Sequence, residues 1–222
     1  MGRFHAQNYT KQNINKDLDL LDVLNQMKLS GNAIESILHT IAWAWTAYRD
    51  IVLKSGEIIS KIAKFRGCEY WTENAVRLKF DQDKNGIWEF RQKFNEEGLR
   101  HEHIVPKIIF KNTVEDYLDH QPSILVNRLP ILKSKMNDNL IGCVVTQLEA
   151  KMLDGKDNGL SNKMPIPQET LDFCEIFEPW ARYKETAKKA GFSQKIYKLE
   201  WDAPTTKNGS WKFISAKEFL SL

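Results

Sequence analysis

Cysteine is scarce in this chain of 222 residues, which has only Cys68, Cys143 and Cys174. An odd number of widely separated cysteines forms neither a paired disulfide framework nor a Cys-x-x-Cys metal site. Free thiols are typical of a reducing compartment. We therefore expect a cytoplasmic protein without disulfide bonds.

Other signatures are missing as well. The first eight residues are polar and lack the apolar stretch of a secretory signal. The sequence predicts no membrane span. It contains no Walker A loop, no dinucleotide-binding glycine motif and no Gly-x-Ser-x-Gly. These absences argue against export, membrane association, nucleotide-driven chemistry and serine-hydrolase chemistry.

The composition is that of a folded protein, with 42% hydrophobic and 27% charged residues. A net charge of +3 is too small to identify a nucleic-acid binder by itself. Basic side chains nevertheless gather in one stretch: Arg91, Lys93, Arg100, Lys107 and Lys111. Such a stretch either provides a positive electrostatic field that attracts phosphates, or is the ordinary solvated surface of a lysine-rich protein.

Hydrophobic periodicity divides the chain into two parts. Apolar residues at steps of three and four predict helices over 20–27, 33–53 and 58–65. We expect residues 1–68 to form a helical bundle or hairpin region. Residues 69–222 predict a mixed region with short strands, so the fold class is α+β.

The second part alternates between the two periods. A buried strand is predicted over 140–145, followed by a helix that begins with the capping box Thr146-x-x-Glu149. The C-terminal residues predict a hairpin of 196–201 with 211–214, and Ser215 with Glu218 predicts a final short helix. Three further helices are expected at 72–80, 87–94 and 179–190.

The most informative motif spans residues 99–106, with the sequence Leu-Arg-His-Glu-His-Ile-Val-Pro. Here a carboxylate is followed directly by a histidine, two apolar residues and proline. A hard divalent cation needs oxygen ligands, whereas proton removal near neutral pH needs a group with the pKa of imidazole. Glu102 and His103 supply both.

This motif resembles the first signature of the HNH nucleases, which have a ββα-metal core. The resemblance implies that Glu102 binds a divalent ion and that His103 is the general base, with His101 as a further metal ligand. Arg100 or Lys107 would bind phosphate. Asn127 is the best candidate for the family's central asparagine.

The resemblance covers few residues. The closing helix of the family normally carries one more asparagine or histidine, for which the candidates here are Asn137, Asn139 and Glu149. The zinc-binding cysteine pairs of many relatives are absent. The metal site is therefore incomplete in the sequence.

We accordingly expect a metal-dependent endonuclease that hydrolyses phosphodiester bonds, with DNA as substrate and Mg²⁺ as cofactor. A restriction or phage-defence role follows by analogy alone. A homodimer would suit two-fold DNA sites.

Different interpretations of the same motif remain open. His101 and His103 would share one face of a strand and could hold a transition metal together with a third ligand that the sequence does not identify. Glu102 could equally be a polar residue that is favourable near a helix N-terminus. The chain would then be a non-enzymatic helical module that binds a protein or nucleic acid.

Two weaker patterns point to other metal sites. Glu149-x-Lys151 resembles the end of the PD-(D/E)xK nuclease signature, but the capping box predicts a helix, on which these side chains diverge. Asp81-x-Asp83-x-Asn85-Gly86 resembles half of an EF-hand loop, although Gln92 replaces its final glutamate. A polar turn between two helices is the favoured interpretation.

Overall fold

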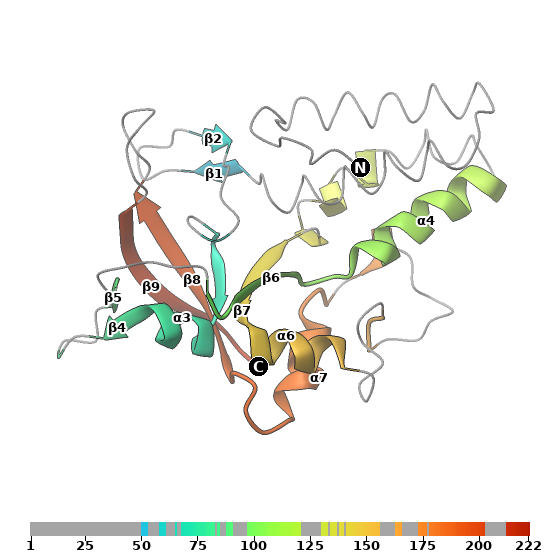
Figure 1. Ribbon diagram of the computed structural model, residues 1–222. Helices are drawn as coiled ribbons and strands as arrows, with labels where there is room; N and C mark the ends of the chain where they lie inside the picture. The colour runs from blue at the N-terminus through green and yellow to red at the C-terminus, as the bar shows by residue number, and fades with distance from the viewer. Residues whose placement is uncertain are drawn as a thin grey trace.

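Figure 1 shows the computed structural model of the chain. The structure describes residues 50–52, 58–60, 65, 68–82, 84, 88–90, 97–120, 130–132, 134–136, 138–139, 141–155, 163–165, 173–176, 178–202 and 212–222. Most of the predicted N-terminal helices lie outside these residues. Every described helix is too short or too polar to traverse a lipid bilayer.

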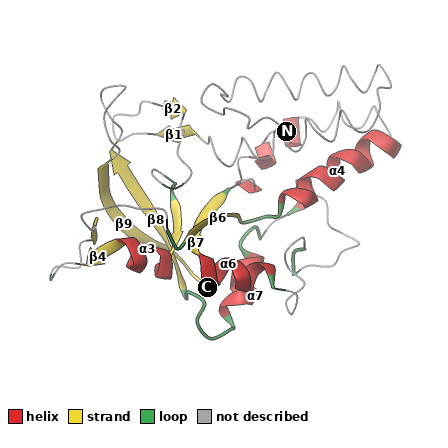
Figure 2. Cartoon of the chain, in the orientation of Figure 1, coloured by secondary structure: helices red, strands yellow, loops and turns green. Residues whose placement is uncertain are grey.

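The described part contains both helices and strands (Figure 2), which confirms the α+β class. The strands are β1 (Asp50–Val52), β2 (Ile58–Ser60), β3 (Tyr70–Thr72), β4 (Phe80–Gln82), β5 (Trp88–Phe90), β6 (Leu99–His103), β7 (Gly142–Thr146), β8 (Lys195–Asp202) and β9 (Lys212–Ser221). The helices are α3 (Glu73–Lys79), α4 (Lys107–His120), α6 (Gln147–Asp154), α7 (Ala181–Ala187) and the short 3-10 helix η3 (Phe173–Glu175).

Five strands form the central sheet in the order β6-β7-β3-β8-β9. β3 and β7 are parallel, whereas the other neighbouring pairs are antiparallel. The strands β6 and β9 are outermost among the described strands. Two smaller antiparallel sheets pair β1 with β2 and β4 with β5.

Side chains from the two faces of the sheet enter two cores. Because successive side chains of a strand point to opposite faces, Tyr70 and Cys143 pack with α6 and α7, whereas Trp71 and Val144 pack with α3 and the β4–β5 hairpin. In Figure 1, α6 and α7 lie beside each other. The helix α4 adds Ile109 and Phe110 to the first of these cores, which contains Tyr70 and Cys143.

The turn from β7 into α6 forms as the sequence predicts. The Thr146 side chain accepts a hydrogen bond from the Glu149 backbone N–H at 3.2 Å, and the Glu149 carboxylate accepts one from the Thr146 backbone N–H at 2.9 Å. This reciprocal pair is a capping box. Glu149 therefore lies on a helix, which argues against the PD-(D/E)xK interpretation.

The Glu149 carboxylate also connects its own turn to two other parts of the chain. It is completely buried and accepts hydrogen bonds from the Thr72 hydroxyl at 2.7 Å, from the Asn74 side-chain amide at 3.1 Å and from the Ser193 backbone N–H at 3.1 Å. The Ser193 hydroxyl donates a further short bond. One side chain thus joins the β3–α3 turn, the β7–α6 turn and the segment before β8.

Several helix predictions are confirmed. The helix predicted over 72–80 is α3, where the Thr72 hydroxyl accepts a hydrogen bond from the Ala75 N–H. The helix predicted over 179–190 is α7, which ends shortly before Gly191, whose φ of 90° is easily adopted only by glycine. The C-terminal hairpin is formed by β8 and β9.

Two helix predictions in the second part are wrong because cross-strand contacts outweigh the local pattern. The 87–94 helix is wrong at residues 88–90, which form β5, where Trp88 is buried and its ring packs against Tyr197. The final helix is overturned by β9, where the Ser215 hydroxyl donates to Glu200 across the hairpin at 2.7 Å, and Glu218 pairs with Lys195 at 2.6 Å.

The strands also correct two other expectations. Asp50–Val52 and Ile58–Ser60 are strands, so the 33–53 and 58–65 helices are wrong at these residues. Asp81 lies on β4, which follows α3 directly and pairs with β5 in a β-hairpin. Strands therefore flank this loop, which removes the helix–loop–helix setting of an EF-hand.

Replacing Glu149 with glutamine should destabilise the protein strongly. The amide keeps one acceptor oxygen but presents an NH₂ group to buried donors, so we expect a loss of about 3 kcal/mol or more in the free energy of unfolding. Chemical denaturation measures this loss. Glu185→Gln on α7 is the matched control, because its side chain is 46% exposed and pairs only with the surface residue Lys188. We expect that control to change stability by less than about 1 kcal/mol; a similarly small effect of Glu149→Gln would contradict the prediction.

Candidate functional site

The motif singled out in the sequence lies on β6 and the turn that follows it. β6 pairs in regular antiparallel register with β7, from Leu99 opposite Thr146 to His103 opposite Gly142. The Ile104 N–H donates to the Ile141 carbonyl at 3.0 Å and extends this pairing by one step. The chain then leads through Pro106 into α4, while β7 leads directly into α6. The motif therefore lies on one of two antiparallel strands, and a helix follows each strand.

Neighbouring residues of β6 point to opposite faces of the sheet. His101 and His103 share one face, where their ring centroids are 5.9 Å apart in an edge-to-face arrangement. Glu102 lies on the other face, opposite Cys143, on the side that α6 and α7 cover. The two predicted metal ligands, His101 and Glu102, are thus not brought together.

Glu102 is partly buried beside a carboxylate and a guanidinium. Burial and, to a smaller extent, the negative charge of Asp154 raise the pKa of Glu102, which is about 7 when all its neighbours are included. The positive charges of Arg182 and Arg100 act in the opposite direction. Around neutral pH this carboxyl group is therefore divided between its protonated and ionised forms.

Arg182 is the buried cation of this face, with 2% of its surface exposed. Its guanidinium donates to the Asp154 carboxylate at 2.9 Å and to the His103 backbone carbonyl at 3.2 Å. Its Nε–H has no hydrogen-bond partner among the described residues. Arg182 therefore joins α7 to the end of α6 and to the end of β6, next to Glu102.

The surroundings of this cluster are neutral. Burial raises the pKa of the Cys143 thiol and of the Tyr183 hydroxyl well above their ordinary values. Within the described part of the chain, the Tyr183 hydroxyl has no partner other than the weakly accepting Cys143 sulfur. Charges near Glu102 consequently interact through a medium of low polarity, where they act more strongly than in water.

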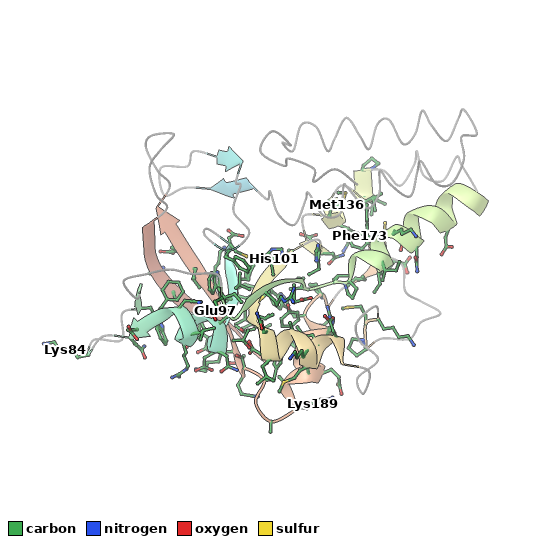
Figure 3. The ribbon with its side chains drawn as sticks, in the orientation of Figure 1. Lys84, Glu97, His101, Met136, Phe173 and Lys189 are labelled. Atoms are coloured by element: carbon green, nitrogen blue, oxygen red, sulfur yellow. The ribbon has the colours of Figure 1, made fainter. Side chains whose placement is uncertain are left out.

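The opposite face of β6 is shaped by Gly142. A Cβ atom at this position would lie 2.0 Å from Nε2 of His101, so the imidazole occupies the space that a side chain would fill (Figure 3). His101 and His103 are both partly buried. Because Gly142, the residue opposite His103, has no side chain, the His101 ring can extend toward the end of the strand.

The structure describes only some of the other predicted site residues. Arg100 is exposed on β6, and Lys107 is the first residue of α4. Asn127 and Asn137 lie outside the described residues. Asn139 is buried and donates to the Phe173 carbonyl at 3.1 Å, a contact within the core.

Asp154 and Arg182 are the polar residues that the sequence analysis missed. Asp154 lies on the final turn of α6, four residues after the buried Ala150, so helical spacing could have placed it toward the sheet. Arg182 gave no comparable signal, because it reaches Glu102 only through the packing of α7 against α6.

Glu102 and Asp154 meet a modest requirement for magnesium. Among the described residues, no group of three or more histidine, cysteine, aspartate or glutamate side chains could hold a metal ion. Mg²⁺, however, is commonly bound by one or two carboxylates with water and substrate phosphate as its other ligands. The pair fits this pattern. A bound ion would share the two carboxylates with the positive charge of Arg182.

Comparison of the chain with family models, with curated proteins and with solved structures finds no match. The functional argument therefore depends on the motif and its geometry.

The raised pKa of Glu102 makes stability depend on pH. The folded protein holds this proton from its ordinary pKa of 4.5 up to about 7, so the free energy of unfolding should fall as the pH rises through this window. Glu102→Gln stays neutral and removes the fall. After allowance for partial exposure, we expect the variant to gain on the order of 1–2 kcal/mol relative to the wild type above pH 7, and nothing below pH 4.5.

Denaturation in EDTA at the two ends of this pH range measures the difference. Glu178→Gln is the control, because the Glu178 side chain is 50% exposed and pairs with Lys184 on the surface. A difference between Glu102→Gln and wild type that is the same at both pH values would refute the expected linkage.

Proposed function

We propose that this protein is a metal-dependent endonuclease that hydrolyses phosphodiester bonds of DNA. The observation that carries the proposal is the placement of the Glu102–His103 pair on β6, beside an antiparallel β7 that runs directly into α6. This arrangement agrees with the ββα core that the motif implies. The separation of β6 and β7 by α4 and its flanking segments makes the unit a long-insert form of such a core.

The residues divide the chemistry between the two faces of β6. Glu102 and Asp154 would hold Mg²⁺, which supplies charge stabilisation at a phosphate oxygen. His103, on the other face, would accept a proton from the attacking water. Because β6 is one of the two outer strands of the described sheet, a phosphodiester lying along its edge would be adjacent to both faces.

The remaining groups position the reactants. The exposed Arg100 on β6 would contact a phosphate next to the cleaved bond, a contact that orients DNA without reading its sequence. Lys107, the first residue of α4, would assist. Arg182 holds the His103 carbonyl and the Asp154 carboxylate, and so fixes the end of β6 relative to α6.

One observation favours the alternative, a non-enzymatic binding module. The ion pair between the buried Arg182 and Asp154, whose side chain is 52% exposed, is also what a purely structural cluster would show. In that case Glu102 is a partly buried acid beside this ion pair, and the histidines are partly buried structural residues. Activity measurements separate these alternatives.

His103→Ala should abolish most of the cleavage. We expect wild-type protein to cut plasmid DNA with Mg²⁺ or Mn²⁺ but not with EDTA, and the variant to be slower by about 10²–10⁴-fold at every metal concentration, since a general base contributes this much. Glu178→Gln should cut like the wild type. Well-folded wild-type protein that cuts neither DNA nor structured RNA with either metal would favour the binding module.

Asp154→Asn should have a different signature. Loss of a metal ligand should raise the Mg²⁺ concentration for half-maximal cleavage by about tenfold or more, while excess Mg²⁺ should restore part of the rate. Arg182→Lys is the matched control, because it loosens the same ion pair but keeps the carboxylate. Equal Mg²⁺ dependence in the two variants would show that the ion pair, rather than a metal ligand, is what Asp154 supplies.

A further inference from the structure

The histidine face of β6 carries a second arrangement of potential ligands. His101 and His103 alternate on a regularly paired strand, so both side chains stand on the same face. Their ring centroids are 5.9 Å apart, and the planes meet at 84°. Both residues are partly buried, which limits their side-chain freedom but leaves them in contact with solvent.

Gly142 leaves space for the His101 ring on the strand opposite His103. Residue 142 is the direct cross-strand partner of His103, and directly opposite Cβ atoms lie about 5 Å apart. The Nε2 atom of His101 lies 2.0 Å from the position that this missing Cβ would take. The Nε2 atom of His101 therefore lies in the space that a side chain of residue 142, the cross-strand partner of His103, would otherwise fill.

This spacing is close to that of a chelate. A zinc–nitrogen bond of about 2.1 Å places each imidazole centre roughly 3 Å from the ion, so two rings at a tetrahedral angle have centres about 5 Å apart. The observed separation is within about 1 Å of this value, a difference that small rotations about side-chain bonds can remove.

We propose that His101 and His103 form a two-imidazole site for a transition-metal ion such as Zn²⁺ or Cu²⁺, on the face of β6 opposite Glu102. Imidazole nitrogen favours these ions over Mg²⁺, whereas the carboxylates of Glu102 and Asp154 favour Mg²⁺. Water completes the coordination. The two faces of one strand thus select two classes of metal ion.

A regulatory role follows, and it rests on the nuclease function proposed above. An ion bound by His103 occupies the nitrogen lone pair that would accept a proton from water. Zn²⁺ should therefore inhibit cleavage supported by Mg²⁺, and excess Mg²⁺ should not relieve this inhibition, because the two ions occupy different sites.

Binding is tested first, without reference to activity. We expect the full-length protein to bind one Cu²⁺ whose electron paramagnetic resonance spectrum shows nitrogen ligands. His101→Asn and His103→Asn should each lower the affinity about tenfold or more, as should Gly142→Ala, whose methyl group displaces the His101 ring. His5→Asn, which removes a histidine outside the motif, should bind like the wild type.

Unchanged Cu²⁺ affinity in both His101→Asn and His103→Asn would overturn the site. The same titrations with Mg²⁺ should show no dependence on these histidines. The inhibitory role is tested separately: stoichiometric Zn²⁺ binding without any slowing of Mg²⁺-dependent cleavage would overturn it. If DNA is not cut at all, the binding measurements still decide whether the site exists.

Discussion

The buried carboxylate of Glu149 is the interaction on which the arrangement of this protein depends. An ionised side chain without exposure to water is tolerated only when hydrogen bonds replace its hydration. Thr72, Asn74, Thr146 and Ser193 provide them. These donors come from separate segments, so satisfying one carboxylate fixes the start of α3, the start of α6 and the approach to β8 relative to one another.

The candidate site is a consequence of that arrangement. Because Glu149 caps α6 at the end of β7, the helix leaves the sheet in a defined direction, and its final turn brings Asp154 toward Glu102 on the neighbouring β6. Arg182 then joins α7 to both elements. The same strand presents its two histidines to the opposite face, where Gly142 makes room for His101. One strand therefore carries an acidic face and an imidazole face.

The sequence was most informative where local signals and tertiary contacts agree. The Thr146–Glu149 capping box, the α3 and α7 helices and the C-terminal hairpin were all predicted from patterns that the packing reinforces. Predictions failed where strand pairing prevailed over local periodicity, as at Trp88 and along β9, whose ladder with β8 offers Ser215 a cross-strand partner. Sequence also could not show that Glu149 links three segments, because two of its donors are more than 70 residues away.

The candidate site was predictable only in part, for a related reason. Glu102 and His103 were found as neighbours in a motif, but adjacency on a strand means opposite faces, and the partner of each is remote in sequence. Asp154 and Arg182 meet Glu102 through the packing of α6 and α7, and Gly142 meets His101 through strand register. Apart from the helical spacing of Asp154 after Ala150, none of these relations leaves a local pattern.

The most direct test of the account is to locate a bound Mn²⁺ ion by paramagnetic broadening of backbone amide resonances. The account predicts that the signals of Glu102 and Asp154 broaden first, and that the effect disappears in the Glu102→Gln, Asp154→Asn double variant. Broadening that is centred instead on exposed acids such as Glu178 and Glu185, or that persists unchanged in the double variant, would contradict it.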